Sequence, residues 1–161
     1  MSESADFKVI RNSTVGSELT EDEARTFASK AGVRHLKDGE LLVAEGAPDH
    51  TLYILAAGKL TVSSLDAGGV QKVVYTMREG ECAGTRAFVE RSPRRATLVA
   101  VGNATVYTLT PDDFDKCLDI NPRLAFKVMR ALFRVTHANL ARMNTESREL
   151  ANYINKTQGR Y

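Results

Sequence analysis

Between residues 33 and 110, short stretches rich in Val, Ile, Leu, Tyr and Thr alternate with glycine-containing turns. Such residues favour strands, and the segment has almost none of the apolar periodicity of a helix. A hairpin signal, Asp66-Ala-Gly-Gly69, separates two of the apolar stretches. The pattern predicts a small antiparallel β-barrel or jelly roll. The turns are expected at Gly39, Gly46, Gly58, Gly68, Gly69, Gly80 and Gly102.

Helices are predicted on both sides of this β segment. Thr20 and Glu23 form a capping box, and Gly32 is a suitable end for the helix that follows them. Thr110-Pro111-Asp112-Asp113 has the cap, the proline and the acidic residues of a second helix start. The fold class is therefore α+β and mostly β. Three parts are expected: a polar lead over 1–19, the β-domain with its N-terminal helix over 20–121, and a C-terminal helix over 122–161.

The C-terminal helix is expected to be long. Asn121-Pro122 ends the preceding helix, and no further glycine or proline occurs before Gly159. About 35 residues at 1.5 Å each give a helix of about 50 Å, which is longer than a domain of this size. A shorter second apolar stripe, Leu124, Val128, Leu132 and Val135, covers only its first half.

Apolar residues at alternating spacings of three and four form a heptad seam along this helix. Such a seam either covers the chain's own β-domain or joins two parallel copies in a homodimer. Because the helix is longer than the domain, we predict the homodimer, and the polar Thr136 and Ser147 indicate a dimer of limited stability. The predicted interface residues are Phe126, Met129, Phe133, Thr136, Leu140, Met143, Leu150 and Ile154.

One segment carries most of the functional information. Gly84-Thr85-Arg86-Ala87-Phe88 can form a glycine turn and one helical turn, and Pro93 ends that run before Arg94. Free N–H groups in a first helical turn attract anions, and an arginine opposite them can clamp a phosphate.

The segment resembles the phosphate-binding cassette of the cyclic nucleotide-binding domains of the catabolite-activator and FNR-like superfamily. The family's usual form is Gly-Glu-Leu-Ala-Leu, four residues, then Pro-Arg-Ala-Ala-Thr. The upstream pairs Gly39-Glu40 and Glu45-Gly46, and the run from Tyr53 to Val62, resemble the family's opening strands. The resemblance covers about residues 20 to 145 and implies the family's jelly-roll fold. The superfamily's transcription factors continue into a helix-turn-helix domain, which this sequence does not contain, so DNA binding of that kind is not expected.

The resemblance also implies a ligand site. Arg94 would bind the phosphate, and backbone N–H groups of the cassette's glycine and helical turn would assist it. Asn139 falls where the bacterial activator presents a helix hydroxyl to the base, although it can equally be a polar residue of the seam. Arg95 can tune the site or be a solvated surface residue. The full set of expected ligand-binding residues is Gly84, Thr85, Arg86, Ala87, Phe88, Arg94, Arg95, Ala96, Thr97 and Asn139.

Thr85 departs from the family pattern. The family places there a glutamate that holds the ribose hydroxyl, and threonine is shorter and uncharged. Its structural alternative is to cap the short helix. Loss of a charged hydrogen bond weakens affinity by roughly 10- to 100-fold. The pocket is therefore expected to bind cAMP or cGMP weakly, to bind another anionic ligand, or to stay empty.

Other functions have little support in the sequence. No stretch is long and apolar enough for a membrane span, and the cysteines and histidines have no metal-ligand spacing. No nucleophile motif suggests an enzyme, and a net charge of +2 does not suggest a nucleic-acid partner. Arg123, Lys127, Arg130 and Arg134 form a basic ridge that is either solvated or faces an acidic partner.

We therefore expect a cytoplasmic, stand-alone regulatory module that is homodimeric, needs no cofactor or metal, and signals to an unidentified protein partner. Binding would change the hinge near Asn121 and reorient the long helix. The alternative from another class is a ligand-free scaffold dimer. A DNA-binding regulator of which this is one part is a third reading.

Overall fold

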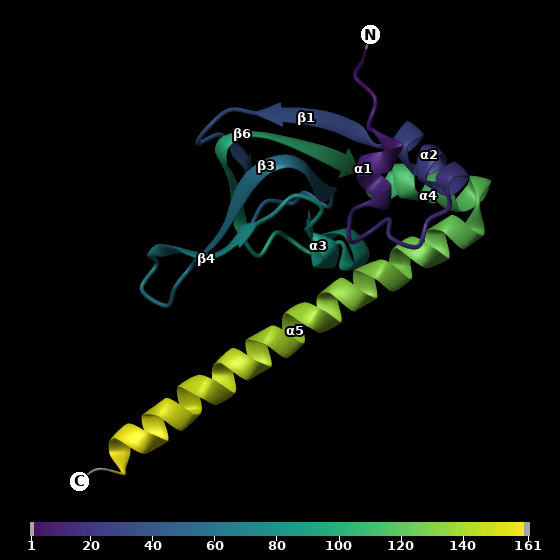
Figure 1. Cartoon of the computed structure of the whole chain (residues 1–161). Coiled ribbons are helices and arrows are strands. Elements are labelled where there is room, and N and C mark those ends of the chain that lie inside the picture. Colours follow the sequence, from purple (N-terminus) through teal and green to yellow (C-terminus); the bar gives the residue numbers. More distant parts are fainter. Residues whose placement is uncertain (1, 160–161) are drawn as a thin grey trace.

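The computed structural model of the chain describes residues 2–159 and consists of a β-sheet, a group of helices at one end of it, and one long helix that leaves the domain (Figure 1). The elements in chain order are α1 (Phe7–Arg11), α2 (Glu21–Lys30), β1 (Gly32–Leu36), β2 (Leu41–Val43), β3 (Leu52–Leu65), β4 (Gln71–Met77), β5 (Cys82–Ala83), α3 (Thr85–Glu90), β6 (Thr97–Leu109), α4 (Pro111–Ile120) and α5 (Pro122–Gln158).

The strands form one antiparallel sheet in the order β1-β6-β3-β4, with β2 paired to β6 and β5 paired to β3. The jelly-roll type of α+β fold expected from the sequence is confirmed. The hydrogen-bonded ladder does not close, because β1 and β4 remain its two edges. The predicted hairpin is also confirmed: β3 and β4 are joined at Asp66, whose N–H donates to the carbonyl of Val70 at 2.9 Å.

Two of the predicted glycine turns are bends inside long strands instead. Gly58 lies within β3 and Gly102 within β6, and both have positive φ. A Cβ on Gly58 would lie 2.4 Å from the carbonyl oxygen of Asn103, so only glycine lets the two bent strands approach here. The β3–β6 register shifts at this point, which is typical of bulges that curve a sheet.

The first residues are more than a polar lead. Asp6 caps α1, accepting a hydrogen bond from the N–H of Lys8 at 2.8 Å, and Ile10 and Val15 are fully buried. They pack with α2, α4 and the start of α5 in one apolar cluster against the sheet. Residues 5–19 therefore form part of the core that positions the long helix.

The capping box is present in full, and it extends into a buried ion pair. The Glu23 carboxylate accepts a hydrogen bond from the backbone N–H of Thr20, and the backbone N–H of Glu23 donates to the Thr20 hydroxyl. The same carboxylate pairs with Lys127 of α5 at 2.8 Å, and both side chains are mostly buried. Gly32, which was expected to end this helix, is the first residue of β1, and Ala31 is the cap.

The basic ridge on α5 faces acids of its own chain. Besides Lys127, Arg130 and Arg134 both pair with Glu18, the latter at 2.6 Å. These pairs fasten the N-terminal segment to the long helix. Three of the four predicted ridge residues therefore pair with acids of their own chain, whereas no ion pair is recorded for Arg123 within residues 2–159.

We expect Glu23→Ala to destabilise the domain by about 2–4 kcal/mol, because it breaks the capping box and leaves Lys127 buried without its partner. Burial alone would raise the pKa of Glu23, but hydrogen bonds from Lys127 and Thr20 lower it overall. A lowered folded-state pKa contributes stability above the unfolded value that is lost as pH falls through the folded one. Urea unfolding at pH 7 and pH 3 should show the variant's deficit shrinking in acid. A deficit equal at both pH values would contradict the ion-pair account.

Helix α5 runs without a break for 37 residues, close to the predicted length, after Asn121 caps it. Leu124, Val128 and Leu132 are buried in the domain, whereas the heptad seam remains outside. Phe133 is 73% exposed and Leu140 54% exposed, so the seam does not cover this chain's own sheet. The second half of the helix projects away from the domain (Figure 1). No helix within residues 2–159 combines the length and apolar character needed to cross a bilayer.

Candidate ligand-binding site

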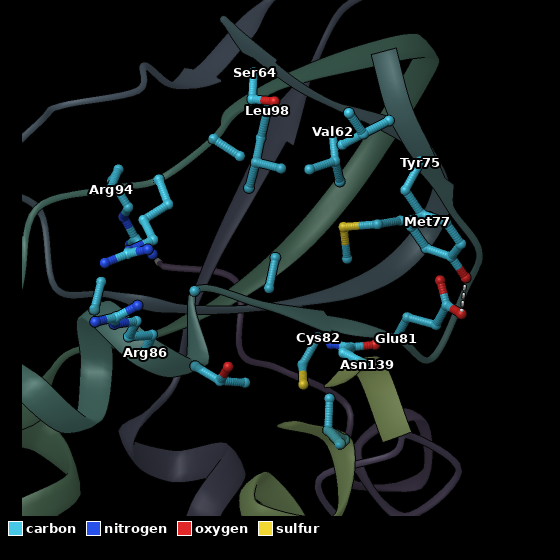
Figure 2. Close-up of a pocket in the computed structure, with 18 of the residues that line it drawn as sticks. Val62, Ser64, Tyr75, Met77, Glu81, Cys82, Arg86, Arg94, Leu98 and Asn139 are labelled. Atoms are coloured by element: carbon cyan, nitrogen blue, oxygen red, sulfur yellow. Dashed lines mark hydrogen bonds between the residues drawn. The ribbon is translucent and has the colours of Figure 1, made fainter. Parts of the chain in front are cut away.

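A cavity of about 920 Å³ lies between the curved sheet, α3 and the middle of α5. Its floor is apolar and includes Val62, Met77 and Leu98, and its charged side chains lie at the margins (Figure 2). Arg86 and Arg94 occupy one end, and Tyr75, Glu81 and Asn139 the other. A volume of this size is in the range that encloses a nucleotide-sized ligand.

The cassette begins at Gly84, which has φ +84° and precedes the first turn of α3. A Cβ at this position would lie 1.9 Å from Nη1 of Arg94 and 3.0 Å from the carbonyl oxygen of Thr51. Glycine is therefore required twice, for its backbone conformation and because the guanidinium lies directly against it.

Arg94 is held in place by its backbone and by part of its side chain. Its N–H donates to the carbonyl of Ala47, its carbonyl accepts from Gly46, and its Nη2 donates to the carbonyl of Thr51. Only 3% of the side chain is exposed, yet Nε and Nη1 have no hydrogen-bond partner among residues 2–159. A buried charged donor without a partner is costly unless a ligand supplies the acceptor.

Asp49 lies beside this arginine, with its Oδ2 3.2 Å from Nη2 of Arg94. Partial burial would raise the pKa of Asp49, but hydrogen bonds from Tyr53 and Thr51 and the charge of Arg94 lower it to about 2. Burial and the bond to Asp49 raise the pKa of Tyr53 to about 12. Asp49 thus stays ionised and orients the guanidinium without using Nε or Nη1.

The short helix places its predicted residues differently. Thr85 is the first residue of α3, half-buried at the cavity wall, and Gly84 takes the cap position, so the predicted alternative of a Thr85 cap is wrong. Arg86 lines the cavity while its Nε donates to Glu90 at 2.8 Å. Within the described chain, no acceptor is recorded for the N–H groups of Thr85, Arg86 or Ala87. Those three N–H groups are available to donate hydrogen bonds to an anion.

Phe88 and Thr97 lie outside the cavity lining, unlike the other predicted ligand residues. The N–H of Phe88 donates to the carbonyl of Gly84 at 2.9 Å, and its ring packs edge-on against Phe114 in the core. The Thr97 hydroxyl accepts from the N–H of Glu45 at 2.9 Å and links β6 to the turn after β2. Both residues therefore stabilise the segments that flank the cassette and do not face the cavity.

The remaining predicted residues, Arg95, Ala96 and Asn139, line the cavity. Arg95 is exposed at its rim, and Asn139 enters from α5. Met143, predicted as a seam residue, also lines the cavity, so the seam and the cavity meet at this side chain.

Several cavity residues were not predicted from the sequence. Tyr75 lies on β4 and Glu81 directly precedes β5. Arg142 and Glu146 extend the contribution of α5 beyond Asn139. Arg142 stacks over Tyr75, with its Cζ 4.6 Å from the ring centroid. The helical periodicity could have predicted the two α5 residues in part, because Arg142 and Glu146 follow Asn139 at spacings of three and four and so lie on the same face of the helix.

Nucleophilic or metal chemistry has no support at this cavity. Burial raises the pKa of the Cys82 thiol to about 11, which keeps it protonated at neutral pH. No group of three or more potential metal ligands occurs in the part of the chain that the structure describes. The arrangement is suited to binding an anion beside an apolar floor.

Curated proteins of similar sequence include a kinase from a parasite. The chain is 30% identical over 122 residues to a cGMP-dependent protein kinase of Toxoplasma gondii, an alignment that covers 76% of this chain and 11% of the kinase. The chain therefore spans about a tenth of that curated relative.

Solved structures agree on the fold. A cyclic nucleotide-binding domain from Methylobacillus flagellatus superposes with a TM-score of 0.79 at 20% identity, covering 84% of this chain and 79% of that one. The Thermus thermophilus catabolite activator protein gives 0.77 at 22% identity, covering 86% and 63%. The sequence profile described as "Cyclic nucleotide-binding domain" matches residues 33–121, more than half of the chain, from β1 to the cap of α5. The chain belongs to the cyclic nucleotide-binding domain family.

Proposed function

We propose that this domain is a regulatory module that binds a cyclic mononucleotide in the cavity and signals through α5. The observation that carries the proposal is Arg94, a buried guanidinium at the cavity wall whose Nε and Nη1 have no partner in the described part of the chain. A cyclic phosphate carries two exocyclic acceptor oxygens, and either of them can accept a hydrogen bond from an unpaired guanidinium N–H. Free N–H groups of Thr85, Arg86 and Ala87 add further donors.

Signalling would use the contact between the cavity and α5. Asn139, Arg142 and Met143 of α5 line the cavity, and the helix starts at the Asn121 cap after α4. A ligand that contacts α5 only in one position of the helix shifts the population toward that position. The exposed seam of α5 would carry the change to a second copy of this chain and to a protein partner.

Thr85 supports a second candidate, a scaffold dimer with no ligand. Its side chain is uncharged and lies at the cavity wall where a longer carboxylate would reach further into the cavity. If the ribose has no strong acceptor, the cavity binds cyclic mononucleotides too weakly for signalling. The two candidates differ in one measurable quantity, the affinity for cAMP and cGMP.

Calorimetric titration of the wild type with cAMP and cGMP tests the proposal. The same titration of Thr85→Glu tests whether a carboxylate at this position restores a ribose contact. We expect the wild type to bind at least one of them in the micromolar to millimolar range, and Thr85→Glu to bind about tenfold or more tightly, because a carboxylate can accept from the ribose hydroxyl. Thr157→Glu adds the same charge at an exposed position far along α5 and should leave the affinity unchanged.

The scaffold candidate makes the opposite forecast. If neither wild type nor Thr85→Glu binds either nucleotide at millimolar concentration while circular dichroism shows a folded protein, the binding proposal is wrong. A gain in Thr85→Glu with a silent wild type would mean that the cavity is intact and only the ribose contact is missing.

A further inference from the structure

The end of the cavity away from Arg94 carries its own polar residues. Figure 2 places Tyr75, Glu81 and Asn139 there, across the apolar floor from Arg86 and Arg94. When a cyclic nucleotide places its phosphate at Arg94, its base extends toward this second end. The chemistry of that end therefore decides which base is accepted.

Arg142 is the cation at this end, and its position is fixed by aromatic stacking. Its Cζ lies 4.6 Å from the centroid of the Tyr75 ring, and the Tyr75 hydroxyl donates to Oε1 of Glu81 at 2.6 Å. The other oxygen of Glu81 accepts from the N–H of Arg78 at 2.9 Å. The ring is thereby oriented, and the guanidinium on it is oriented in turn.

The donors of Arg142 remain available. No hydrogen bond or ion pair to its guanidinium is recorded within residues 2–159, although Glu146 lines the same cavity one helical turn further on. A guanidinium that stacks by its face keeps its N–H groups in the plane of the group and directed outward. Arg142 therefore presents an unused planar fork at the base end.

We propose that Arg142 makes the cavity selective for guanine over adenine, an inference that rests on the proposed function. Guanine presents O6 and N7 as adjacent acceptors, which match the two-pronged donor of an arginine. Adenine replaces O6 with an amino donor, so the same arginine keeps one bond at most and faces a second donor.

Glu146 adds to the same preference. Its carboxylate accepts from guanine's N1–H and 2-amino groups, whereas adenine presents only the acceptor N1 along that edge. Asn139 does not discriminate, because an amide can donate and accept and so can pair with either purine. Of the three polar side chains that α5 brings to the cavity, two favour guanine and none favours adenine alone.

The test compares cGMP and cAMP by calorimetry in wild type, Arg142→Ala, Arg142→Lys and the control Arg148→Ala. Wild type should bind cGMP about tenfold or more tightly than cAMP, because a two-pronged arginine contact typically discriminates by roughly 5- to 150-fold. Arg142→Ala should lower the ratio by about fivefold or more and leave only the smaller preference that Glu146 contributes. Lysine keeps the charge without the fork and should restore only part of the ratio. Arg148 lies outside the cavity lining on the exposed part of α5, so its removal should leave the ratio intact.

The same titrations in a Thr85→Glu background raise both affinities and extend the measurable range. If wild type binds cAMP as tightly as cGMP, or if Arg142→Ala keeps the wild-type ratio of the two affinities, the inference is wrong while the proposed function stands. If neither nucleotide binds in either background, both the inference and the proposed function are wrong.

Discussion

Replacing Arg94 with alanine is expected to weaken cyclic nucleotide binding by about 2–4 kcal/mol, or roughly 30- to 1000-fold, the largest loss of any single change in the cavity. The variant removes the buried cation whose Nε and Nη1 have no partner among residues 2–159, and it leaves the ligand's phosphate with backbone donors only. Calorimetry with the tighter-binding nucleotide measures the loss.

Arg94 also has a structural role that the experiment must separate from binding. It donates to the carbonyl of Thr51 and pairs with Asp49, which stays ionised at neutral pH because its pKa lies at about 2. Arg94→Ala leaves that carboxylate without its cation, and some loss of stability is expected. Arg94→Ala combined with Asp49→Asn removes both charges and should recover stability without recovering affinity.

Arg94→Lys provides a second comparison, since it keeps the charge and loses the planar fork. We expect its affinity to lie between those of wild type and Arg94→Ala. Should Arg94→Ala bind as tightly as wild type while remaining folded, the phosphate lies elsewhere and the cassette is not the ligand site.

Local signals in the sequence predicted the fold and one end of the site. The glycine spacing gave the antiparallel sheet, and the Thr20–Glu23 pair gave the start of α2, because turns and caps depend on a few adjacent residues. The same holds for Gly84 and Arg94, which lie ten positions apart in one cassette. The structure adds that a Cβ on Gly84 would collide with Arg94.

What the sequence did not reveal depends on contacts between distant segments. Ile10 and Val15 lie in a short segment with no clear apolar period, and their burial follows from packing against α2 and α5. Gly58 resembles a turn residue, yet it is a bend within β3, where the strand passes close to Asn103 of β6. Arg142 is 67 residues from Tyr75 in the chain, and only the folded structure brings them together.

The exposed seam on α5 leads to the second large expected effect. We expect the wild type to sediment as a homodimer at micromolar concentration, because Phe126, Phe133, Leu140 and Leu150 are all more than half exposed along one helix. Such a continuous apolar surface is typical of an interface. The regular alternation of three and four residues fits a second helix of the same kind, joined as a parallel pair.

Phe133→Asp together with Leu140→Asp should dissociate this dimer, weakening association by roughly 100-fold or more, because each aspartate would be buried without a partner. Ala141→Asp with Thr145→Asp adds two aspartates to exposed positions off the seam and controls for charge and helix propensity. Met143 is left unchanged because it also lines the cavity, so nucleotide affinity can be measured on the same monomer. A wild type that remains monomeric at high micromolar concentration would contradict the interface. A seam variant that stays dimeric would place the contact between copies elsewhere on the domain.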